Sequence, residues 1–294
     1  MKPGPQPDPA SVAFWEDVWQ RSRQSSFLKD SQRSHPERWK EFYDQVAPIW
    51  DAMTGQQEEN HSRLAHAILA QGWAAPGQPV LEVGCGTGAL ARVLAAQGLR
   101  VTALDSSGAM LERLQEKAGP ELKERIKAVH ADWDQFQPPS RFSLALACFF
   151  PQAFNPGGLR RLEGFSRGGC LLLMGDGRET FPLRHQIWLQ IMDHPPQDQS
   201  FHLTCAFNYL LAAGRAPHLK RLVWPTRLDL AQEQVRFYFT RYFAIFGQQG
   251  ARVERAVASA LEPHTIEGRV CLKGEFSLAV LWWPSPAPAG PERD

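Results

Sequence analysis

The chain has 294 residues, 43% of them hydrophobic, enough to bury a sizeable core in one large domain or two small ones. Lys and Arg number 32 against 31 Asp and Glu, so the chain lacks the basic excess typical of nucleic-acid-binding proteins. Five cysteines, without a CxxC pair or a Cys/His cluster at ligand spacing, argue against a disulfide framework and a metal site. No apolar run is long enough to span a membrane and the N-terminus lacks a signal peptide's apolar region, so we expect a cytoplasmic protein without a membrane partner.

The N-terminal quarter of the chain is predicted to be helical. Residues 1–10 and 284–294 are rich in proline, which predicts disordered ends. Hydrophobic residues at helical spacing predict a helical cap over residues 11–75, with its polar stretch 21–35 as an exposed loop. Its helices are expected at 11–19, about 37–47 and about 58–71.

A strand, a glycine-rich turn, a helix and a second strand follow one another between residues 79 and 105. The apolar run 80–83 is typical of a strand that is buried on both faces of a parallel sheet. Glycines then occupy three alternate positions, and the next helix ends near Gly98. The second strand, 101–104, ends on the carboxylate of Asp105. We therefore predict a βαβ unit whose first turn is Gly84, Gly86 and Gly88.

This turn has the properties of a nucleoside site. Glycine can adopt positive φ and lets a ligand approach the backbone closely, while the following helix presents unpaired N–H groups. Asp105 lies about 20 residues further on, where a carboxylate accepts hydrogen bonds from ribose hydroxyls. The spacing is G-x-G-x-G rather than the G-x-G-x-x-G of dinucleotide sites, and the preceding Glu82 favours a cationic ligand over pyrophosphate. A dinucleotide site and a turn without any ligand remain as alternatives.

These residues resemble the motifs of class I methyltransferases that depend on S-adenosyl-L-methionine (SAM). The stretch LEVGCGTG at 81–88 is similar to the first motif, Asp105 to the second, and Asp132–Trp133 to the third, and the likeness covers about residues 76–175. The resemblance implies a Rossmann-like α/β core over 76–177, with a mostly parallel sheet closed by an antiparallel C-terminal hairpin. It also implies SAM as cofactor and S-adenosyl-L-homocysteine as product. The cofactor contacts that it implies are Glu82, Gly84, Cys85, Gly86, Gly88, Asp105, Ser106, Met110, Asp132, Trp133 and Cys148.

Individual roles follow from the same resemblance. It places Ser106 and Met110 near the ribose and adenine, Asp132 on the adenine amino group, and Trp133 against the ring. Cys148 is interpreted either as an unusual nucleophile or acceptor, or as a small buried hydrophobic residue. The segment FYDQVAPIWDAM is similar to the Tyr-Asp…Tyr-Asp element of ubiquinone- and menaquinone-type methyltransferases, so Tyr43 and Trp50 are candidates to cover the cofactor, with plain core packing as the alternative.

The second half of the chain is predicted to add a helical lid over residues 178–249. Aromatic residues between 235 and 246 recur at helical spacing, and Asp229 with Gln232 is expected to cap that helix. Residues 250–283 are predicted to complete the sheet with strands at 269–272 and 277–283 around a turn at 273–275. The polar lid residues that could orient a substrate are Arg184, His185, His202, Tyr209 and His218.

We therefore predict a SAM-dependent methyltransferase that acts on a small molecule by in-line displacement, as a monomer or homodimer without a nucleic-acid partner. No catalytic residue or general base can be assigned. Residues 148–151 lack the Asn/Asp-Pro-Pro-Tyr/Phe tetrad of many enzymes that methylate exocyclic amines. A fainter resemblance, in 207–224, is to an uncharacterised prokaryotic branch near metal-uptake or corrinoid genes. The alternatives are an RNA- or protein-directed methyltransferase and a non-catalytic protein that binds SAM or a nucleoside.

Overall fold

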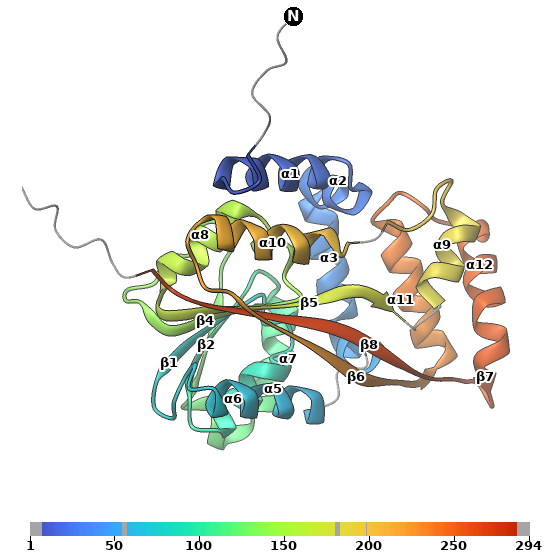
Figure 1. The fold of residues 1–294 in the computed structure, drawn as a ribbon. Helices are drawn as coiled ribbons and strands as arrows, with labels where there is room; N and C mark the ends of the chain where they lie inside the picture. Colours follow the sequence, from blue (N-terminus) through green and yellow to red (C-terminus); the bar gives the residue numbers. More distant parts are fainter. Residues whose placement is uncertain (1–7, 55–57, 180–182, 198, 287–294) are drawn as a thin grey trace, which may run out of the picture.

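The computed structural model describes residues 8–54, 58–179, 183–197 and 199–286. Its centre is an eight-stranded sheet in the order β3-β2-β1-β4-β5-β8-β6, with β7 paired to β8 (Figure 1). The strands are β1 (Pro79–Val83), β2 (Arg100–Asp105), β3 (Ile126–His130), β4 (Phe142–Cys148), β5 (Ser166–Glu179), β6 (His218–Ala231), β7 (Thr265–Ile266) and β8 (Arg269–Pro284).

The first five strands are parallel, and β8 runs antiparallel between β5 and β6. This confirms the expected Rossmann-like sheet with antiparallel C-terminal strands. The chain crosses from β3 at one edge to β4 beside β1, which makes the gap between β1 and β4 the point where the strand order reverses. In open α/β sheets, ligands bind outside the carboxyl ends of the strands at this point.

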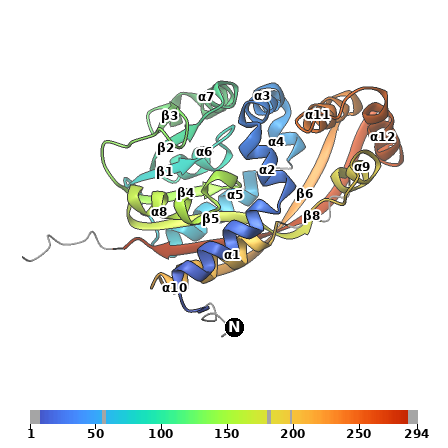
Figure 2. The same ribbon diagram turned by 90° about the horizontal axis from the view of Figure 1, so that it is seen from above.

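Helices cover both faces of the sheet (Figures 1 and 2). The helices α5, α6 and α7 lie on one face, and α1, α8 and α10 lie on the other. The helices are α1 (Val12–Gln24), α2 (Phe27–Ser34), α3 (Pro36–Val46), α4 (Trp50–Met53), α5 (Glu58–Ala70), α6 (Ala89–Ala96), α7 (Gly108–Lys123), α8 (Pro156–Phe165), α9 (Leu183–Ile191), α10 (Phe201–Ala212), α11 (Gln232–Ala244) and α12 (Ala251–Leu261).

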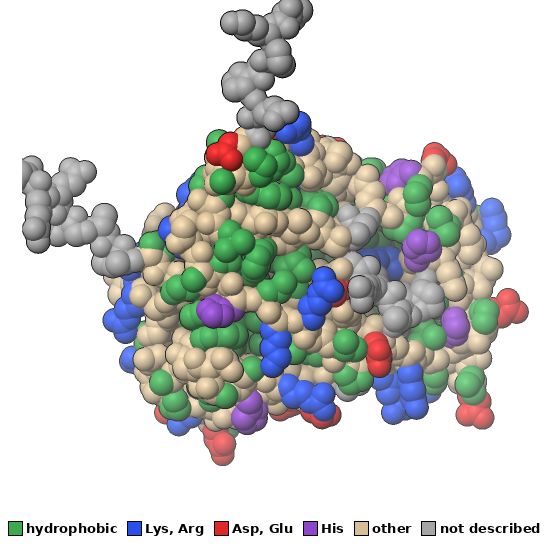
Figure 3. Space-filling view, viewed as in Figure 1, with side chains coloured by type: hydrophobic (Ala, Val, Ile, Leu, Met, Phe, Trp, Pro, Cys, Tyr) green, Lys and Arg blue, Asp and Glu red, His purple; other side chains and the backbone are tan. Residues whose placement is uncertain are grey.

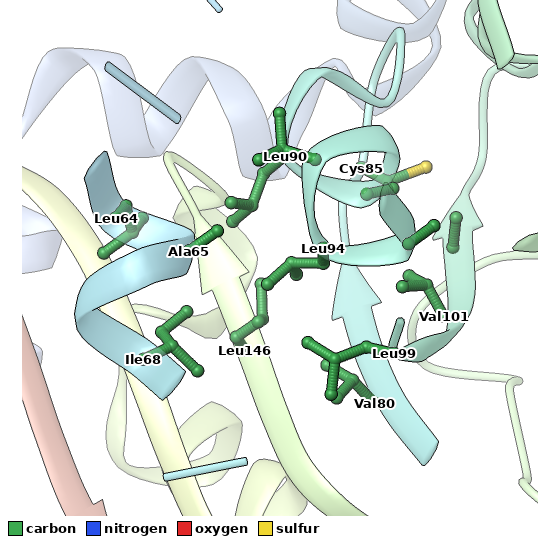
Figure 4. Packing of buried hydrophobic residues seen from close by; sticks show 14 of the residues in the cluster. Leu64, Ala65, Ile68, Val80, Cys85, Leu90, Leu94, Leu99, Val101 and Leu146 are labelled. Carbon is green, nitrogen blue, oxygen red and sulfur yellow. The ribbon is translucent and has the colours of Figure 1, made fainter. Parts of the chain in front are cut away.

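Three hydrophobic clusters hold these layers together. In the first, Leu64 and Ile68 of α5 and Leu90 and Leu94 of α6 pack against the sheet, including Leu146 of β4 (Figure 4). The second fills the opposite face, beneath α1, α8 and α10. The third joins α3 to α9, α11 and α12, and these last three helices lie at the right of Figure 1. Hydrophobic side chains also gather on the surface over α1 and α10 (Figure 3).

The polar stretch 21–35 was expected to be an exposed loop, and this prediction is wrong. It forms the end of α1 and all of α2, which begins after Ser26, whose hydroxyl accepts a hydrogen bond from the Lys29 N–H. Lys29 and Ser31 are buried despite their polarity, because α2 packs between neighbouring helices. The predicted disordered ends lie mostly outside the described residues, but Asp8–Ser11 forms a turn and β8 extends to Pro284.

The antiparallel C-terminal pair is present, but its two strands differ from those expected. β8 runs straight through the predicted turn at 273–275, and its partner is β6, from His218 opposite Trp282 to Ala231 opposite Arg269. The segment 178–249 is therefore not purely helical, and α12 lies where more sheet was expected. Cross-strand pairing over the whole length of β6 outweighs the local turn tendency of Lys273-Gly274-Glu275.

The expected cap of α11 is also wrong. Asp229 belongs to β6 and accepts a hydrogen bond from Arg269 Nε of β8 at 2.8 Å, so its carboxylate stabilises the pairing of these strands instead. The helix begins after Ala231, which makes no side-chain cap.

Candidate functional site

A cavity of about 440 Å³ lies at the carboxyl ends of β1, β2 and β4. The glycine turn forms one side of it, and α2, α3 and α4, together with β6 and α11, contribute other walls. Gly88, Asp132 and Trp133 are not among its lining residues. The predicted cofactor contacts that line it are Tyr43, Trp50, Glu82, Gly84, Cys85, Gly86, Asp105, Ser106, Met110 and Cys148.

The glycines of the turn serve two different purposes. Gly84, Gly86 and Gly88 all have positive φ, between 54° and 73°, a region that other residues rarely adopt. At Gly88 a side chain would also lie 2.4 Å from Leu114 of α7, so this glycine allows α6 to pack closely on α7. At Gly84 a Cβ would lie 2.3 Å from the ring of Phe150. The turn is thus shaped by packing on one side and borders the cavity on the other.

Asp105 is held against the turn by backbone N–H groups. Its Oδ2 accepts from the N–H of Gly86 at 2.8 Å, and its Oδ1 accepts from the N–H of Ser107 at 2.9 Å. Burial raises the pKa of this carboxyl group, and the backbone hydrogen bonds, including one from Ser106, oppose that rise. An ionised carboxylate offers about four acceptor positions, so Asp105 keeps capacity for a further donor from a ligand.

Glu82, on β1, is the most deeply buried carboxyl group of the cavity. It is 2% exposed, and its Oε2 has no hydrogen-bond partner. Burial, and after it the nearby charge of Asp105, raises the pKa of Glu82 to about 8. A buried carboxyl oxygen without a partner costs free energy, and a ligand that carries an ammonium group would relieve this cost. Glu82 and Asp105 together give this side of the cavity a preference for cations.

The segment from α3 to α4 is tied to the glycine turn and to α7. The Ser107 hydroxyl donates to Asp44 Oδ1 at 2.5 Å, and the Thr87 hydroxyl donates to Asp51, which also pairs with Lys117. These contacts explain how a helical segment that precedes the core in sequence comes to lie over its first turn. Asp44 and Asp51 were not singled out from the sequence, although each directly follows an aromatic residue in the quoted motif.

Tyr43 and Trp50 lie in this segment and line the cavity. Their ring centroids are 5.5 Å apart with the planes nearly perpendicular. Burial, together with the nearby Asp105, raises the pKa of the Tyr43 phenol, so that it stays protonated. Both rings also pack within the third hydrophobic cluster, so lining the cavity and core packing occur together.

The end of β4 contributes a strained segment to the same cavity. Cys148 lines it, and burial raises the pKa of this thiol well above its usual value, which keeps it protonated and weakly nucleophilic. The next residue, Phe149, has φ 52°, a left-handed conformation that is uncommon for a residue other than glycine. Strain of this kind clusters at functional sites. It allows Phe150 to turn back over Gly84.

Asp132 and Trp133 lie apart from the cavity wall. Asp132 is exposed. The ring of Trp133 is buried against Phe150 and Phe165, at centroid distances of 5.9 and 5.6 Å, with the Arg161 guanidinium 5.1 Å from it. The ring belongs to the second hydrophobic cluster. Their predicted contacts with adenine remain predictions.

Only one of the polar lid candidates, Arg184, lines the cavity. His202 and Tyr209 lie on α10, where His202 Nδ1 accepts from Trp19 Nε1 at 3.0 Å and the Tyr209 hydroxyl accepts from Arg160 at 2.9 Å. They join α10 to neighbouring helices instead of facing the cavity. His218 packs against Trp282, and His185 is exposed on α9. For all but Arg184, the expected place in the substrate site is therefore wrong.

Aromatic residues that the sequence did not single out as site residues form much of the remaining wall. They come from α3, β6, α11 and β8, elements that lie far apart in the chain. Trp39 and the pair on α11 belong to patterns visible in the sequence, the aromatic stripes of their two helices, whereas the rings on β6 and β8 do not. These residues are Trp39, Trp224, Tyr238, Phe239 and Phe276.

Within the described part of the chain, no helix combines the length and hydrophobicity needed to cross a membrane. The same residues contain no cluster of three His, Cys, Asp or Glu side chains that could hold a metal ion. The described wall of the site is formed mainly by the glycine turn, the two carboxyl groups of Glu82 and Asp105 beside it, and aromatic rings.

The strand order and the turn define a Rossmann-like, nucleoside-binding α/β domain. The family model described as "Methyltransferase domain" matches residues 80–162, from β1 to α8. The chain thus contains a class I, SAM-dependent methyltransferase domain, and SAM is its cofactor.

Individual known proteins resemble the chain as follows. Over 75 residues the chain is 35% identical to a malonyl-[acyl-carrier protein] O-methyltransferase of Serratia marcescens. The aligned stretch covers 26% of this chain and 28% of that enzyme. YjhP from E. coli superposes with a TM-score of 0.51 and 18% identity, over 82% of this chain and 99% of YjhP. A SAM-dependent methyltransferase from Geobacter sulfurreducens, in complex with S-adenosyl-L-homocysteine, gives a TM-score of 0.50 and 15% identity, over 77% of this chain and 91% of that protein. At 18% and 15% identity, the YjhP and Geobacter sulfurreducens structures show that the fold is shared.

Proposed function

We propose that this protein transfers a methyl group from SAM to a small-molecule acceptor. The observation that carries the proposal is the pair of carboxyl groups, Glu82 and Asp105, which flank one glycine turn and line one cavity. SAM carries a ribose, an ammonium group and a positively charged sulfur. Asp105 has acceptor capacity left for a ribose hydroxyl, and the unpartnered Glu82 Oε2 suits the ammonium group. The residues present therefore fit this cofactor.

In the proposed function each part of the wall has its own task. Asp105 holds the ribose, Glu82 attracts the cationic end, and Ser106 and Met110 border the nucleoside. Tyr43 and Trp50 cover the site and keep water out. When bound, SAM supplies the electrophilic methyl group. An apolar aromatic wall favours a transition state in which the charge of the sulfur is being lost, relative to the more highly charged ground state.

The proposal needs no covalent intermediate. In-line displacement depends on holding the acceptor atom behind the methyl carbon, and orientation alone can supply much of the rate. The Cys148 thiol is held protonated by burial, so we assign it no nucleophilic role. We assign no general base either.

The size and position of the cavity support a small acceptor. Its walls come from α2, α3, α4 and α11 as well as from the sheet, so a bound molecule would be surrounded on several sides. The Serratia marcescens relative is named for an acceptor attached to a carrier protein, and a small acyl group presented in this way would also suit such a cavity. We propose further that the protein acts in the cytoplasm, as a monomer or homodimer.

Calorimetric titration with S-adenosyl-L-homocysteine, SAM and NAD tests the cofactor part. We expect micromolar binding of the first two and none of NAD, because the glycine spacing disfavours pyrophosphate. Binding of NAD without any response to S-adenosyl-L-homocysteine would contradict the proposal. Transfer of labelled methyl from SAM into the small-molecule, RNA and protein fractions of an extract then distinguishes the acceptor classes. Cofactor binding with no labelled product in any fraction would instead favour a non-catalytic SAM-binding protein.

A further inference from the structure

Five aromatic rings outside the glycine turn and outside the Tyr43–Trp50 segment also line the cavity. These rings come from four different elements, which hold them in place through the third cluster and through the β6–β8 pair. Flat apolar walls of this kind suit a ligand with an aromatic or conjugated body. We refer to the space lined by Trp39, Trp224, Tyr238, Phe239 and Phe276 as the aromatic chamber.

Helix α2 carries a buried cation, Lys29, that forms no ion pair with a carboxylate of the described residues. Lys29 is 8% exposed. Its charged neighbour Arg23 is also a cation, whose guanidinium donates to the Phe154 carbonyl oxygen at 2.7 Å. Burial, and after it the charge of Arg23, lowers the pKa of Lys29 to about 7. A buried ammonium group in this setting is stabilised by any anion that comes near.

Gln32 connects this cation to the cavity. Lys29 Nζ donates to Gln32 Oε1 at 3.1 Å, one helical turn further along α2, and Gln32 lines the cavity. Because its oxygen is engaged by Lys29, the amide group of Gln32 has its two N–H donors available for a ligand. A hydrogen bond of this kind is polarised by the ammonium group behind it. Gln32 is thus a donor whose strength depends on Lys29.

The charged residues of the cavity wall away from the glycine turn are also mostly cations. Lys40 on α3 and Arg184 on α9 also line the cavity. The carboxyl groups of Glu82 and Asp105 flank the glycine turn, which leaves Glu275 of β8 as the acidic residue of the remaining described wall. Away from the cofactor side, the described wall is therefore richer in cations than in anions.

We propose that the methyl acceptor is an aromatic or conjugated acid whose anionic group is received by Gln32, with Lys29 as the charge behind it. This inference rests on the proposed function and names its acceptor class. The flat body occupies the aromatic chamber, and the carboxylate or phenolate accepts the hydrogen bond from the Gln32 amide. Gln32 is a specificity-determining residue, and Lys29 is a positioning residue that acts through it.

The test uses the full chain saturated with S-adenosyl-L-homocysteine. A panel of aryl carboxylates, 2-naphthoate among them, is titrated by calorimetry against the matching neutral primary amides. We expect the acids to bind at least about tenfold more tightly than their amides. Gln32→Glu should remove most of this preference, because the new carboxylate pairs with Lys29 and repels the ligand. Amide binding should change little.

Two further variants keep the result interpretable. Lys29→Met retains the length of the side chain but not its charge, and it should also abolish the preference for acids. Gln20→Glu makes the same charge change at an exposed position of α1 and should leave the preference intact. Equal binding of acids and amides, no binding by any panel member, or the same effect from Gln20→Glu as from Gln32→Glu would overturn the inference. If the inference fails in one of these ways but the native protein still binds S-adenosyl-L-homocysteine, the proposed methyltransferase function stands. If the native protein does not bind S-adenosyl-L-homocysteine, the inference and the proposed function both fail.

Discussion

Asp105 Oδ2 and the backbone N–H of Gly86 lie 2.8 Å apart, so the carboxylate that ends β2 is bonded directly to the glycine turn that follows β1. The two strands are neighbours in register, with Val83 opposite Leu104. This bond fixes the position of the carboxylate before any ligand binds. A site with this geometry is preorganised for a ribose, because little has to be ordered on binding.

The first prediction concerns Asp105. Asp105→Ala should weaken the binding of S-adenosyl-L-homocysteine by at least about tenfold, since hydrogen bonds to a charged group contribute roughly 1.5–3 kcal/mol each. The affinity of Asp105→Asn should lie between those of the native protein and Asp105→Ala, because the amide oxygen can still accept a hydrogen bond from the Gly86 N–H. Calorimetry on both variants measures this. Asp134→Ala, an exposed carboxylate outside the cavity wall, is the control. Unchanged dissociation constants would mean that Asp105 does not hold the ribose.

A second prediction follows from the buried Glu82. Its pKa is raised from 4.5 to about 8 in the folded protein, so between these values the folded state binds more protons than the unfolded state. The free energy of unfolding of the apo protein should therefore fall as pH rises through this window. Glu82→Gln cannot ionise and should show a shallower decline, measured by denaturant unfolding at a series of pH values. Parallel curves for the two proteins would show that Glu82 ionises normally.

The third prediction concerns the α3–α4 segment and the helices beyond it. S-adenosyl-L-homocysteine should slow hydrogen exchange in Gly84–Gly88 first and then in the segment from Tyr43 to Trp50, because Asp44 and Asp51 tie that segment to the turn. Helices α9 and α11 should exchange faster than the central strands in the apo protein if they act as a lid. If they are already as protected as β4 without ligand, they are scaffold.

The fourth prediction separates stability from binding at His202. His202→Ala leaves the buried Trp19 N–H without its acceptor, which should lower the free energy of unfolding by about 1–3 kcal/mol. Its affinity for S-adenosyl-L-homocysteine should not change, because α10 lies outside the cavity wall. Denaturant unfolding and calorimetry on the same preparation measure both quantities. A weakened affinity without loss of stability would show that His202 contributes to the binding site.

Predictions from the sequence were most successful where the determining interactions are local. The strands at 79–83 and 100–105, the helix between them and the glycine turn are all encoded within one continuous stretch. A short apolar run, a turn that needs positive φ and a carboxylate at a strand end each leave a mark in the residues themselves. The class of fold and the cofactor could therefore be predicted, and the family comparison agrees with both.

Only the tertiary structure decided how distant segments meet. β6 and β8 pair along almost their whole length, although α11 and α12 separate them in the chain. Neither the mixed polar and apolar sequence of β6 nor the turn-like residues 273–275 predict this pairing. The burial of Lys29, its bond to Gln32 and the commitment of Trp133 to a core likewise depend on which helices pack together. Local patterns specify backbone conformation and the identity of a turn. The surroundings of a side chain depend on contacts between residues remote in sequence, and these contacts determined which polar residues reached the cavity.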